Sequence, residues 1–248
     1  MEKKPMSPSK ELVDFLNSGH LYMPGISIDC VIFGFHDRQL KVLVLQFKST
    51  DGYALPGGFI RKEEHIDDAA RRILEERTGL KEIYLEQFHV FGDSERGRDD
   101  THRKFSRANG IELEADHWLL QRFLSIGYYA LVDFSRAMPT PDVFSDTCQW
   151  YDLAGLPDLI LDHNRIVQQA LETLRLMLDN KLVGFNLLPE TFTMNELQAL
   201  YETILDKPLL RANFQRKMLS LEILERLEKK WTGKAHKAPY LYRFQDRH

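Results

Sequence analysis

Acidic side chains around a glycine pair mark the stretch of this chain that could do chemistry. Gly57 and Gly58 are followed by Glu63 and Glu64, and further along by a second acidic pair at Glu75 and Glu76. Hard divalent cations such as Mg²⁺ prefer oxygen ligands of this kind. A metal ion held by carboxylates can activate a water molecule for hydrolysis. These glutamates are therefore candidates for a catalytic metal site.

The stretch from Gly58 to Leu80 resembles the Nudix box. In Nudix hydrolases, glutamates of this motif lie on one face of a helix and bind Mg²⁺ or Mn²⁺, which activates water against a diphosphate. Two of the glutamates that define the motif are absent, because Ile73 and Arg77 occupy their positions. The residues that match the motif at the required spacing are Gly58, Glu64, Arg72, Leu74, Glu76, Gly79 and Leu80.

The two replacements argue against a metal site and against catalysis. Positions 73, 76 and 77 are spaced so that their side chains share one face of a helix. Ile73 offers no oxygen ligand, and Arg77 is a permanent cation where a second cation would have to bind. We therefore expect no catalytic residue, no metal and no cofactor. The alternative is a hydrolase with a rebuilt site that uses the glutamates at 63, 64, 75 and 76.

Composition limits the class of protein. The chain has 248 residues, of which 43% are hydrophobic and 28% are charged, as in a soluble globular protein of one or two domains. The start, MEKKPMSPSK, has no apolar core of a signal peptide, and no run of residues is long enough to span a membrane. Cys30 and Cys148 lie in apolar, strand-like surroundings. We expect a cytoplasmic protein without a membrane partner, and two reduced core cysteines.

Charge is distributed unevenly along the chain. The formal net charge is −4, but residues 181–248 hold 12 Lys and Arg against 8 Asp and Glu. From residue 207 to the end the count is 11 against 4. Residues 1–180, by contrast, hold more Asp and Glu than Lys and Arg. An acidic body followed by a basic region indicates a nucleic-acid-binding part at the C-terminal end.

The elements around the motif predict a sheet between helices. Alternating or continuous apolar residues predict strands, and a 3.6-residue stripe of Val167, Ala170, Leu171, Leu174 and Leu178 predicts a helix over 162–179. With the motif helix, this order is similar to the α/β/α Nudix sandwich, which the resemblance places at residues 21–180 after a polar lead at 1–20. The expected strands are 26–35, 40–47, 82–91, 122–132 and 148–152.

A long polar segment from Asp93 to Gln121 interrupts this order. It is longer than most connections between elements, and we expect either a solvated loop or a border of a ligand pocket, since long loops in compact domains are often functional. Polar groups beside the motif are the best candidates to bind a small ligand. The candidate ligand-binding residues are Asp29, Arg61 and, in the stretch from Asp93 to Arg98, Asp93, Glu95 and Arg96.

Residues 181–248 show the order of a winged helix. Thr193 and Glu196 form a capping box, and Phe192 can pack on Leu197 as a hydrophobic staple. A core face of Leu197, Leu200, Tyr201 and Ile204 follows. A second helix over 210–219 is expected to bury Leu210, Phe214 and Met218, and strands over 227–231 and 240–244 flank a basic hairpin tip. Helix, turn, helix and β-hairpin is the order of a winged helix-turn-helix domain.

The exposed faces of these elements carry side chains that can bind DNA. Arginine, asparagine and glutamine can contact base edges, and lysine can contact phosphates. The competing interpretation is a charged, solvated face on a dimerisation or protein-binding module. The candidate DNA-binding residues are Arg211, Asn213, Gln215, Arg216 and Lys217 on the second helix, and Lys234 and Lys237 at the hairpin tip.

The segments Gly184–Pro189, Phe192–Thr193 and Arg211–Phe214 resemble the C-terminal half of Nudix-related transcriptional regulators. That resemblance implies a decayed Nudix domain as sensor, a double-stranded DNA operator and a small-molecule effector. Similar members respond to arabinose in sugar catabolism, or sense ADP-ribose in NAD metabolism. Residues 25–35, 57–59 and 185–189 favour the sugar-responsive branch, so we expect a sugar-responsive regulator, with ADP-ribose as the alternative effector. A homodimer is expected, because helix-turn-helix readers usually bind pseudo-palindromes.

Overall fold

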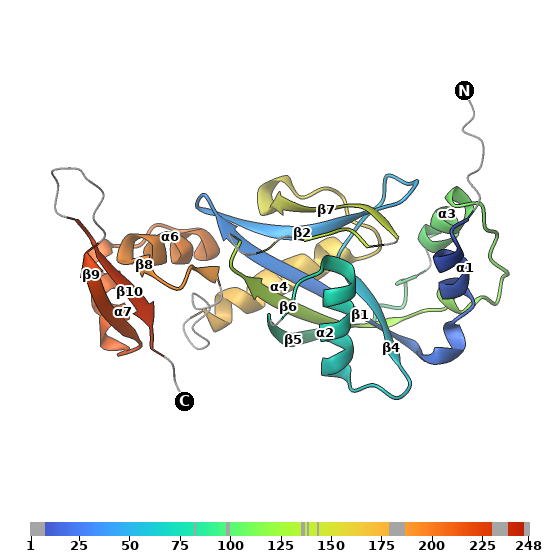
Figure 1. The fold of residues 1–248 in the computed structure, drawn as a ribbon, viewed down its shortest axis with the longest axis horizontal. Helices are drawn as coiled ribbons and strands as arrows, with labels where there is room; N and C mark the ends of the chain where they lie inside the picture. The colour runs from blue at the N-terminus through green and yellow to red at the C-terminus, as the bar shows by residue number, and fades with distance from the viewer. Residues whose placement is uncertain are drawn as a thin grey trace, which may run out of the picture.

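The computed structural model has an elongated shape with a mixed sheet at its centre. Figure 1 shows the C-terminal elements β8, β9, β10, α6 and α7 at one end of the molecule and the helices α1 and α3 at the other. The structure describes residues 8–81, 83–97, 100–134, 137, 139–142, 144–178, 187–229 and 238–245.

The central sheet has seven strands, and β1 is its axis. This strand pairs in antiparallel register with β2 and β4 and in parallel register with β6, from Ile26 opposite Leu124 to Gly34 opposite Val132. The path through the sheet is β3-β2-β1-β6-β5, with β4 on β1 and β7 on β2. The strands are β1 (Tyr22–His36), β2 (Gln39–Phe47), β3 (Tyr53–Ala54), β4 (Gly57–Arg61), β5 (Tyr84–Phe91), β6 (Leu124–Val132) and β7 (Ser145–Asp152).

Both faces of the sheet are covered by helices, which is why β1 is apolar along its length. Successive side chains of a strand point to opposite faces. Ile28, Cys30 and Ile32 belong to the core cluster that contains α2 (Ile66–Thr78), while Val31 and Phe33 belong to the cluster that contains α4 (His163–Met177). The expected α/β/α sandwich is confirmed, and Figure 1 shows α2 and α4 on opposite sides of the sheet.

Local signals predicted both sandwich helices well. All five residues of the predicted stripe, from Val167 in α4 to Leu178 just after its last residue, are buried. Helix α2 ends at Gly79, whose φ of 71° is left-handed and therefore favours glycine. Its amide donates to the carbonyl of Glu75 at 2.7 Å. A single residue that tolerates this backbone conformation thus determines where α2 stops.

Two segments for which no helix was predicted contain helices. The polar lead contains α1 (Lys10–Leu16), whose first turn is capped by the Ser9 side chain, which accepts from the Leu12 amide at 3.2 Å. The segment from 93 to 121 contains α3 (Thr101–Ala108) and the short helix η2 (Trp118–Leu120). Leu12 and Leu16 pack with Leu113 and Leu119 in a third core cluster. The interpretation of this segment as a solvated loop was wrong, because the packing partners of Leu113 and Leu119 lie about one hundred residues earlier in the chain.

The C-terminal part has the winged-helix order. Helix α6 begins with the predicted capping box, since Thr193 and Glu196 cap each other's amides at 2.6 and 3.2 Å. The face formed by Leu197, Leu200, Tyr201 and Ile204 is buried, as predicted. The elements are β8 (Phe192–Thr193), α6 (Met194–Leu205), α7 (Arg211–Ser220), β9 (Leu224–Lys229) and β10 (Tyr240–Phe244), with the three strands in the order β8-β10-β9.

Two details of this part differ from the prediction. Leu210 was expected in the core but is 75% exposed. It is the N-cap of α7 with an extended backbone, so the helical spacing to Phe214 does not place it on the helix's buried face. Strand β9 begins at Leu224 rather than at residue 227, and residues 230–231 of the predicted strand lie outside the described residues.

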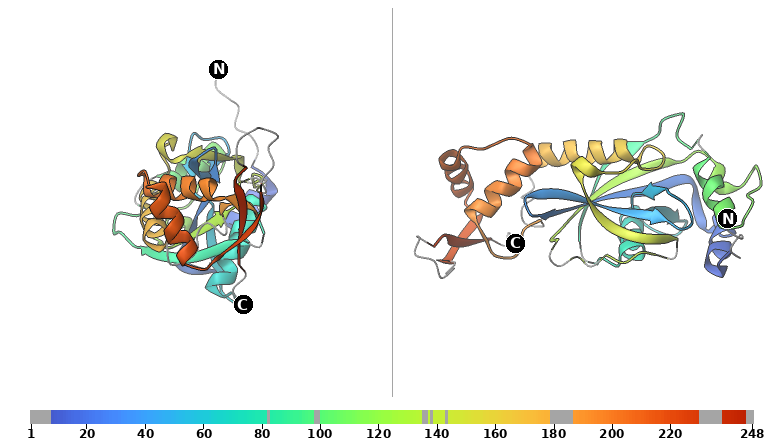
Figure 2. Two further views of the ribbon diagram at one scale, coloured as in Figure 1. Left: turned by 90° about the vertical axis from the view of Figure 1, so that its left-hand side faces the viewer. Right: turned by 90° about the horizontal axis from the view of Figure 1, so that it is seen from above.

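The winged-helix elements pack directly on the sandwich. The Arg175 side chain of α4 donates through Nε to the carbonyl of Ile204 in α6 at 2.7 Å. The hydroxyl of Thr203 donates to the carbonyl of Arg38, in the turn between β1 and β2, at 3.1 Å. Figure 2 shows α4 running along the sheet toward α6. The boundary expected near residue 180 lies within 179–186, outside the described residues.

The remaining expectations from composition concern cysteines and membranes. Cys30 and Cys148 are free and buried, which confirms their placement in the core. Burial raises the pKa of both thiols, that of Cys148 to about 12. Within the described ranges, no helix has the length and apolar character needed to cross a membrane.

The ring of Phe214 is expected to hold the winged helix together. It is buried and contacts the ring of Tyr201 edge-on, with centroids 5.1 Å apart. Phe214→Ala should lower the free energy of unfolding by about 3–5 kcal/mol. Leu219→Ala on the same helix, where the side chain is 44% exposed, should change it by less than about 0.5 kcal/mol. Urea unfolding followed by circular dichroism measures both, and equal stability of the two variants would contradict the assignment of Phe214 to the core.

Candidate functional site

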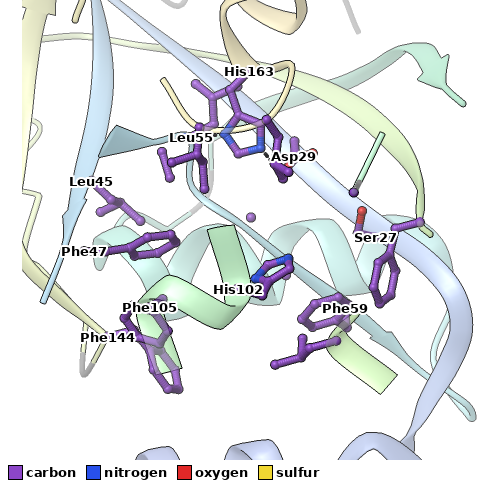
Figure 3. Close-up of a pocket in the computed structure, with 18 of the residues that line it drawn as sticks. Ser27, Asp29, Leu45, Phe47, Leu55, Phe59, His102, Phe105, Phe144 and His163 are labelled. Atoms are coloured by element: carbon purple, nitrogen blue, oxygen red, sulfur yellow. Dashed lines mark hydrogen bonds and ion pairs between the residues drawn. The ribbon is translucent and has the colours of Figure 1, made fainter. Parts of the chain in front are cut away.

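A cavity opens where β1 and β4 meet the first turn of α4. Its volume is about 130 Å³, and it is polar on one side and aromatic on the other. In Figure 3, Asp29 and His163 lie on the polar side, and Phe47, Phe105 and Phe144 gather across the cavity from them. A concave site of this composition is typical of small-molecule binding.

A buried ion pair forms the polar wall of the cavity. Arg96 donates through Nη2 to Asp29 Oδ2 at 2.7 Å, and both side chains are less than 10% exposed. Ser125 in β6 also donates to Asp29 Oδ2. The other end of the Arg96 guanidinium pairs with Asp162, the N-cap of α4. A buried guanidinium thus lies between two carboxylates that come from different elements.

His163 continues this polar wall in a defined tautomer. The amide of Leu55 donates to His163 Nδ1 at 3.0 Å, so Nδ1 carries no proton while this bond exists. The proton of the neutral imidazole is then on Nε2, which faces Asp29 Oδ1 at 3.5 Å. Asp162 Oδ2 is buried and accepts no hydrogen bond within the part of the chain that the structure describes.

These contacts keep Asp29 ionised despite its burial. Burial alone would raise the pKa of Asp29, but the neighbouring His163 and Arg96 and the hydrogen bonds from Ser125 and Arg96 together hold that pKa below its ordinary value of 3.8. Asp29 is therefore an acceptor at neutral pH. A ligand that enters the cavity meets a fixed arrangement of donors and acceptors.

The aromatic wall comes from segments far apart in the sequence. Phe15 in α1 contacts Phe59 in β4 and Phe144 ahead of β7, with ring centroids 6.1 and 4.9 Å apart. The indole of Trp118 donates to the carbonyl of Leu16 at 2.8 Å and thereby ties η2 to α1. Helix α3 contributes His102 and Phe105 to the lining. The two unexpected helical segments thus build one side of the cavity.

The structure brings together only two of the five candidate ligand residues. Asp29 and Arg96 line the cavity, whereas Arg61 is exposed and pairs with Glu76 at 3.5 Å. Asp93 and Glu95 are exposed in a turn beside the cavity and do not line it, and Arg98 lies outside the described residues. In this turn the side chain of Arg96 points inward to Asp29, whereas Asp93 and Glu95 are exposed to solvent. Sequence analysis missed further lining residues, which include His163, Ser27, His102 and Gln121.

The glutamates of the motif are engaged by arginines. Arg72 donates to Glu64 through Nε and Nη2, both at 2.7 Å, and to Glu76 through Nη1 at 3.0 Å. Its Nη2 also donates to the carbonyl of Phe59 at 2.9 Å. The hydrogen bonds from Arg72 lower the pKa of Glu64. These carboxylates hold α2 against the loop after β4.

The two replaced positions do not fit a divalent cation. Ile73 is 1% exposed in the core cluster under α2, and its side chain would lie 3.0 Å from a Cβ at Gly58. Arg77 donates through Nε to the carbonyl of Gly57 at 2.8 Å and forms an ion pair with Asp142. Within the described ranges, no cluster of three or more acidic, histidine or cysteine side chains could hold a metal ion. Ile73 supplies no oxygen ligand and Arg77 is a cation, so neither side chain can bind Mg²⁺.

A second, larger cavity adjoins the first across Arg77. Its volume is about 590 Å³. Lys48, Arg72 and Arg77 supply cations to its wall, and Glu76 and Asp142 supply carboxylates. Phe15, Gly58, Phe59, Arg77 and Phe144 belong to the lining of both cavities. The two cavities are therefore neighbouring parts of one site.

The candidate DNA-binding side chains of α7 lie on its outer face. Arg211, Asn213, Arg216 and Lys217 are exposed, and Gln215 is half-buried. Arg216 donates through Nη2 to Asn213 Oδ1 at 3.1 Å. Phe214 and Met218 are 5% and 1% exposed on the inner face. The helix thus separates a core face from a polar face that is open to a partner.

The hairpin of β9 and β10 adds cations that sequence analysis did not single out. The guanidinium of Arg226 lies 4.7 Å from the centre of the Tyr240 ring, and the ammonium of Lys229 lies 5.3 Å from it. The available signal was Tyr240 at the start of one predicted strand, with basic residues in and just before the other predicted strand. Lys234 and Lys237 at the predicted hairpin tip lie outside the described residues.

Two family profiles match the chain. The sequence profile of the NUDIX domain matches residues 23–171. The profile of the NrtR DNA-binding winged helix domain matches residues 184–244.

Individual relatives extend over nearly the whole chain. An ADPR responsive transcriptional repressor, NtrR, from Acinetobacter baylyi is 29% identical over 231 residues, which is 90% of this chain and 84% of the relative. The crystal structure of Shewanella oneidensis NrtR is 29% identical with a TM-score of 0.67, covering 89% of this chain and 94% of that one. The same protein in complex with a 27mer DNA is 27% identical with a TM-score of 0.66, covering 89% and 93%.

The buried ion pair should make folding stability depend on Asp29 and on pH. Asp29→Asn should destabilise the protein at pH 7, toward the lower end of about 3–5 kcal/mol, since Arg96 keeps Asp162 as a partner. Because the pKa of Asp29 is lowered in the folded state, its stabilising effect is complete above the ordinary value of 3.8 and is lost as the pH falls through the folded pKa.

The measurement is urea unfolding of both proteins between pH 7 and the lowest pH at which they stay folded. The stability gap between wild type and Asp29→Asn should narrow as the pH falls below 3.8. Asp68→Asn, which alters an exposed pair with Arg71 at 3.4 Å, is the matched control and should have little effect. A stability gap that stays constant with pH would contradict an ionised, stabilising Asp29.

Proposed function

Because the chain belongs to the Nudix family and ends in an NrtR-type winged helix, we propose that it is a ligand-responsive transcriptional regulator. The Nudix domain binds an effector, and the winged helix binds double-stranded DNA. The observation that carries this proposal is the polar outer face of α7, with exposed Arg211, Asn213 and Arg216. These are side chains that can contact base edges and phosphates.

The effector in this proposal is ADP-ribose. The support is the relative from Acinetobacter baylyi, which is described as ADPR responsive and matches 90% of this chain. Sequence analysis favoured a sugar effector, but neither the Acinetobacter baylyi nor the Shewanella oneidensis relative is described as responding to a sugar. The site is also larger and more basic than a sugar requires. It joins an aromatic cavity to a larger cavity with basic residues in its wall. We therefore replace the sugar with ADP-ribose.

The Nudix domain acts as a sensor and not as a hydrolase in this proposal. Hydrolysis in the family requires a metal ion held by glutamates, and the box positions 73 and 77 hold a buried isoleucine and an arginine. Glu64 and Glu76 are engaged by Arg72. A site that binds the effector without cleaving it leaves the effector concentration unchanged, so the fraction of protein with bound effector follows that concentration.

The regulator binds its operator as a homodimer in this proposal. A two-fold protein presents two recognition helices to two half-sites of a pseudo-palindrome. The effector favours one arrangement of these helices by binding it more tightly. Helix α4 carries the response, because its first turn lines the cavity and its Arg175 contacts α6.

ADP-ribose should bind and remain intact. At a concentration of 100 times its Kd it should stabilise the native protein by about 2.7 kcal/mol, and it should change the affinity for operator DNA by a factor of about 5–150. The measurements are thermal unfolding with ADP-ribose, and anisotropy titration with an operator selected from random duplexes. Arabinose is the comparison ligand, and stabilisation by arabinose alone would contradict ADP-ribose as effector.

The hydrolase alternative has its own test. Incubation with ADP-ribose and Mg²⁺ or Mn²⁺ should release no AMP above a control without protein. Turnover on the order of 1–1000 per second, the usual enzymatic range, would restore the hydrolase interpretation.

Arg211 and Arg216 should carry DNA binding. Arg211→Ala with Arg216→Ala should weaken operator binding by about 1–3 kcal/mol for each arginine that reads a base, or reduce the salt slope by about 0.9 for each arginine that binds a phosphate. Anisotropy titrations at several salt concentrations separate these outcomes. Arg107→Ala is the control, because Arg107 is exposed on α3 and pairs with Glu112 at the far end of the molecule. Full operator binding by the folded double variant would refute the winged-helix interface.

A further inference from the structure

Arg77 lies at the junction of the two cavities. It is on the last turn of α2, its side chain is 17% exposed, and it belongs to the lining of both cavities. In the Nudix pattern this position holds a glutamate for the metal. In the family pattern, the metal ion supplies the positive charge at this place. Here Arg77 supplies a positive charge itself.

The contacts of Arg77 fix its guanidinium in place. Nε donates to the carbonyl of Gly57 at 2.8 Å, Nη1 pairs with Asp142, and the group lies 4.8 Å from the centre of the Phe144 ring. Asp142 is itself oriented, since its Oδ1 accepts from the Phe144 amide at 3.1 Å. Among the described residues, the Nη2 group of Arg77 has no hydrogen-bond acceptor. One donor group of a fixed cation is thus left for a ligand.

A second cation faces the larger cavity. Lys48 is half-buried in its wall, and its ammonium forms no ion pair with the residues that the structure describes. Arg72 also lines this cavity, but it pairs with Glu64 and Glu76, and Glu76 pairs in turn with Arg61, so these two arginines and two glutamates balance. Asp142 offsets Arg77, so Lys48 leaves the wall with an uncompensated positive charge. A desolvated wall of this charge favours an anion.

We propose that Arg77 and Lys48 take the place of the divalent cation and bind the diphosphate of a nucleoside diphosphate derivative without metal. The inference rests on the proposed function, since ADP-ribose supplies such a diphosphate. The planar guanidinium of Arg77 binds phosphate oxygens through directed N–H groups, and Lys48 adds a point charge. The aromatic cavity beside them, with Phe59 and Phe144 shared by both cavities, accommodates a ring of the ligand.

This assignment explains binding without cleavage. A metal ion in a Nudix site both holds the diphosphate and activates water, whereas an arginine only holds it. The guanidinium of Arg77 already carries its full set of protons and has no acceptor site, so it cannot take a proton from water as a base. Replacement of the metal ligand by Arg77 therefore keeps the affinity for the diphosphate and removes the reaction.

The test is calorimetric titration of the full-length protein with ADP-ribose and with inorganic pyrophosphate, each in EDTA and in Mg²⁺. Wild type should bind both ligands in EDTA. Lys48→Gln and the double variant Arg77→Ala with Asp142→Ala should each weaken binding at least about tenfold, the loss expected for a hydrogen bond to a charged group. The double variant removes both partners, so no buried charge is left unpaired.

Matched controls separate the site from general charge effects. Arg71→Ala removes an exposed arginine on the same helix, outside both cavities, and should leave binding unchanged. Thermal unfolding without ligand confirms that each variant is folded. Arg77→Glu should abolish binding in EDTA.

The outcomes distinguish this inference from the proposed function. Binding of pyrophosphate but not ADP-ribose in EDTA would refute the effector and support the metal-free site. Binding of either ligand only with Mg²⁺ would overturn the metal-free site and leave the effector standing. Wild-type affinity in both the Lys48 variant and the folded Arg77 double variant would also overturn the metal-free site. The absence of binding to either ligand would overturn it as well.

Discussion

The buried pair of Asp29 and Arg96 is the interaction on which the rest of the site depends. It joins β1 to the turn after β5, and through Asp162 and Ser125 it also holds α4 and β6. A buried charge without a partner is costly, so each of these elements must take its position for the others to be stable. The contacts of this pair thus fix the donors and acceptors of the polar wall before a ligand binds.

Helix α4 extends this constraint to the other end of the molecule. His163 in its first turn belongs to the polar wall, and Arg175 near its last turn donates to α6. Leu178, just after the helix, accepts from the Tyr201 hydroxyl at 3.3 Å, and Tyr201 packs on Phe214 of α7. The candidate effector site and the candidate DNA-binding helix are thus connected through the same rigid element.

Local sequence signals predicted the elements that obey local rules. The capping box at Thr193, the glycine after α2 and the stripe on α4 each involve residues within a few positions of one another. The helices α1 and α3 were missed because their burial depends on each other across about ninety residues. The same limit applies to the site. Asp29 and Arg96 were recognisable as polar residues near the motif, whereas nothing local indicated that His163 or Phe144 would reach the cavity.

The two cysteines give the protein a practical property. Both thiols are buried, and burial raises their pKa, that of Cys148 to about 12. A thiol must be exposed and ionised to react quickly with maleimides or nitroxide reagents. The native cysteines are therefore expected to react slowly with such reagents while the protein is folded. A single cysteine introduced on the outer face of α7 can be labelled selectively, and the surroundings of the label can then be followed by spectroscopy without altering the core.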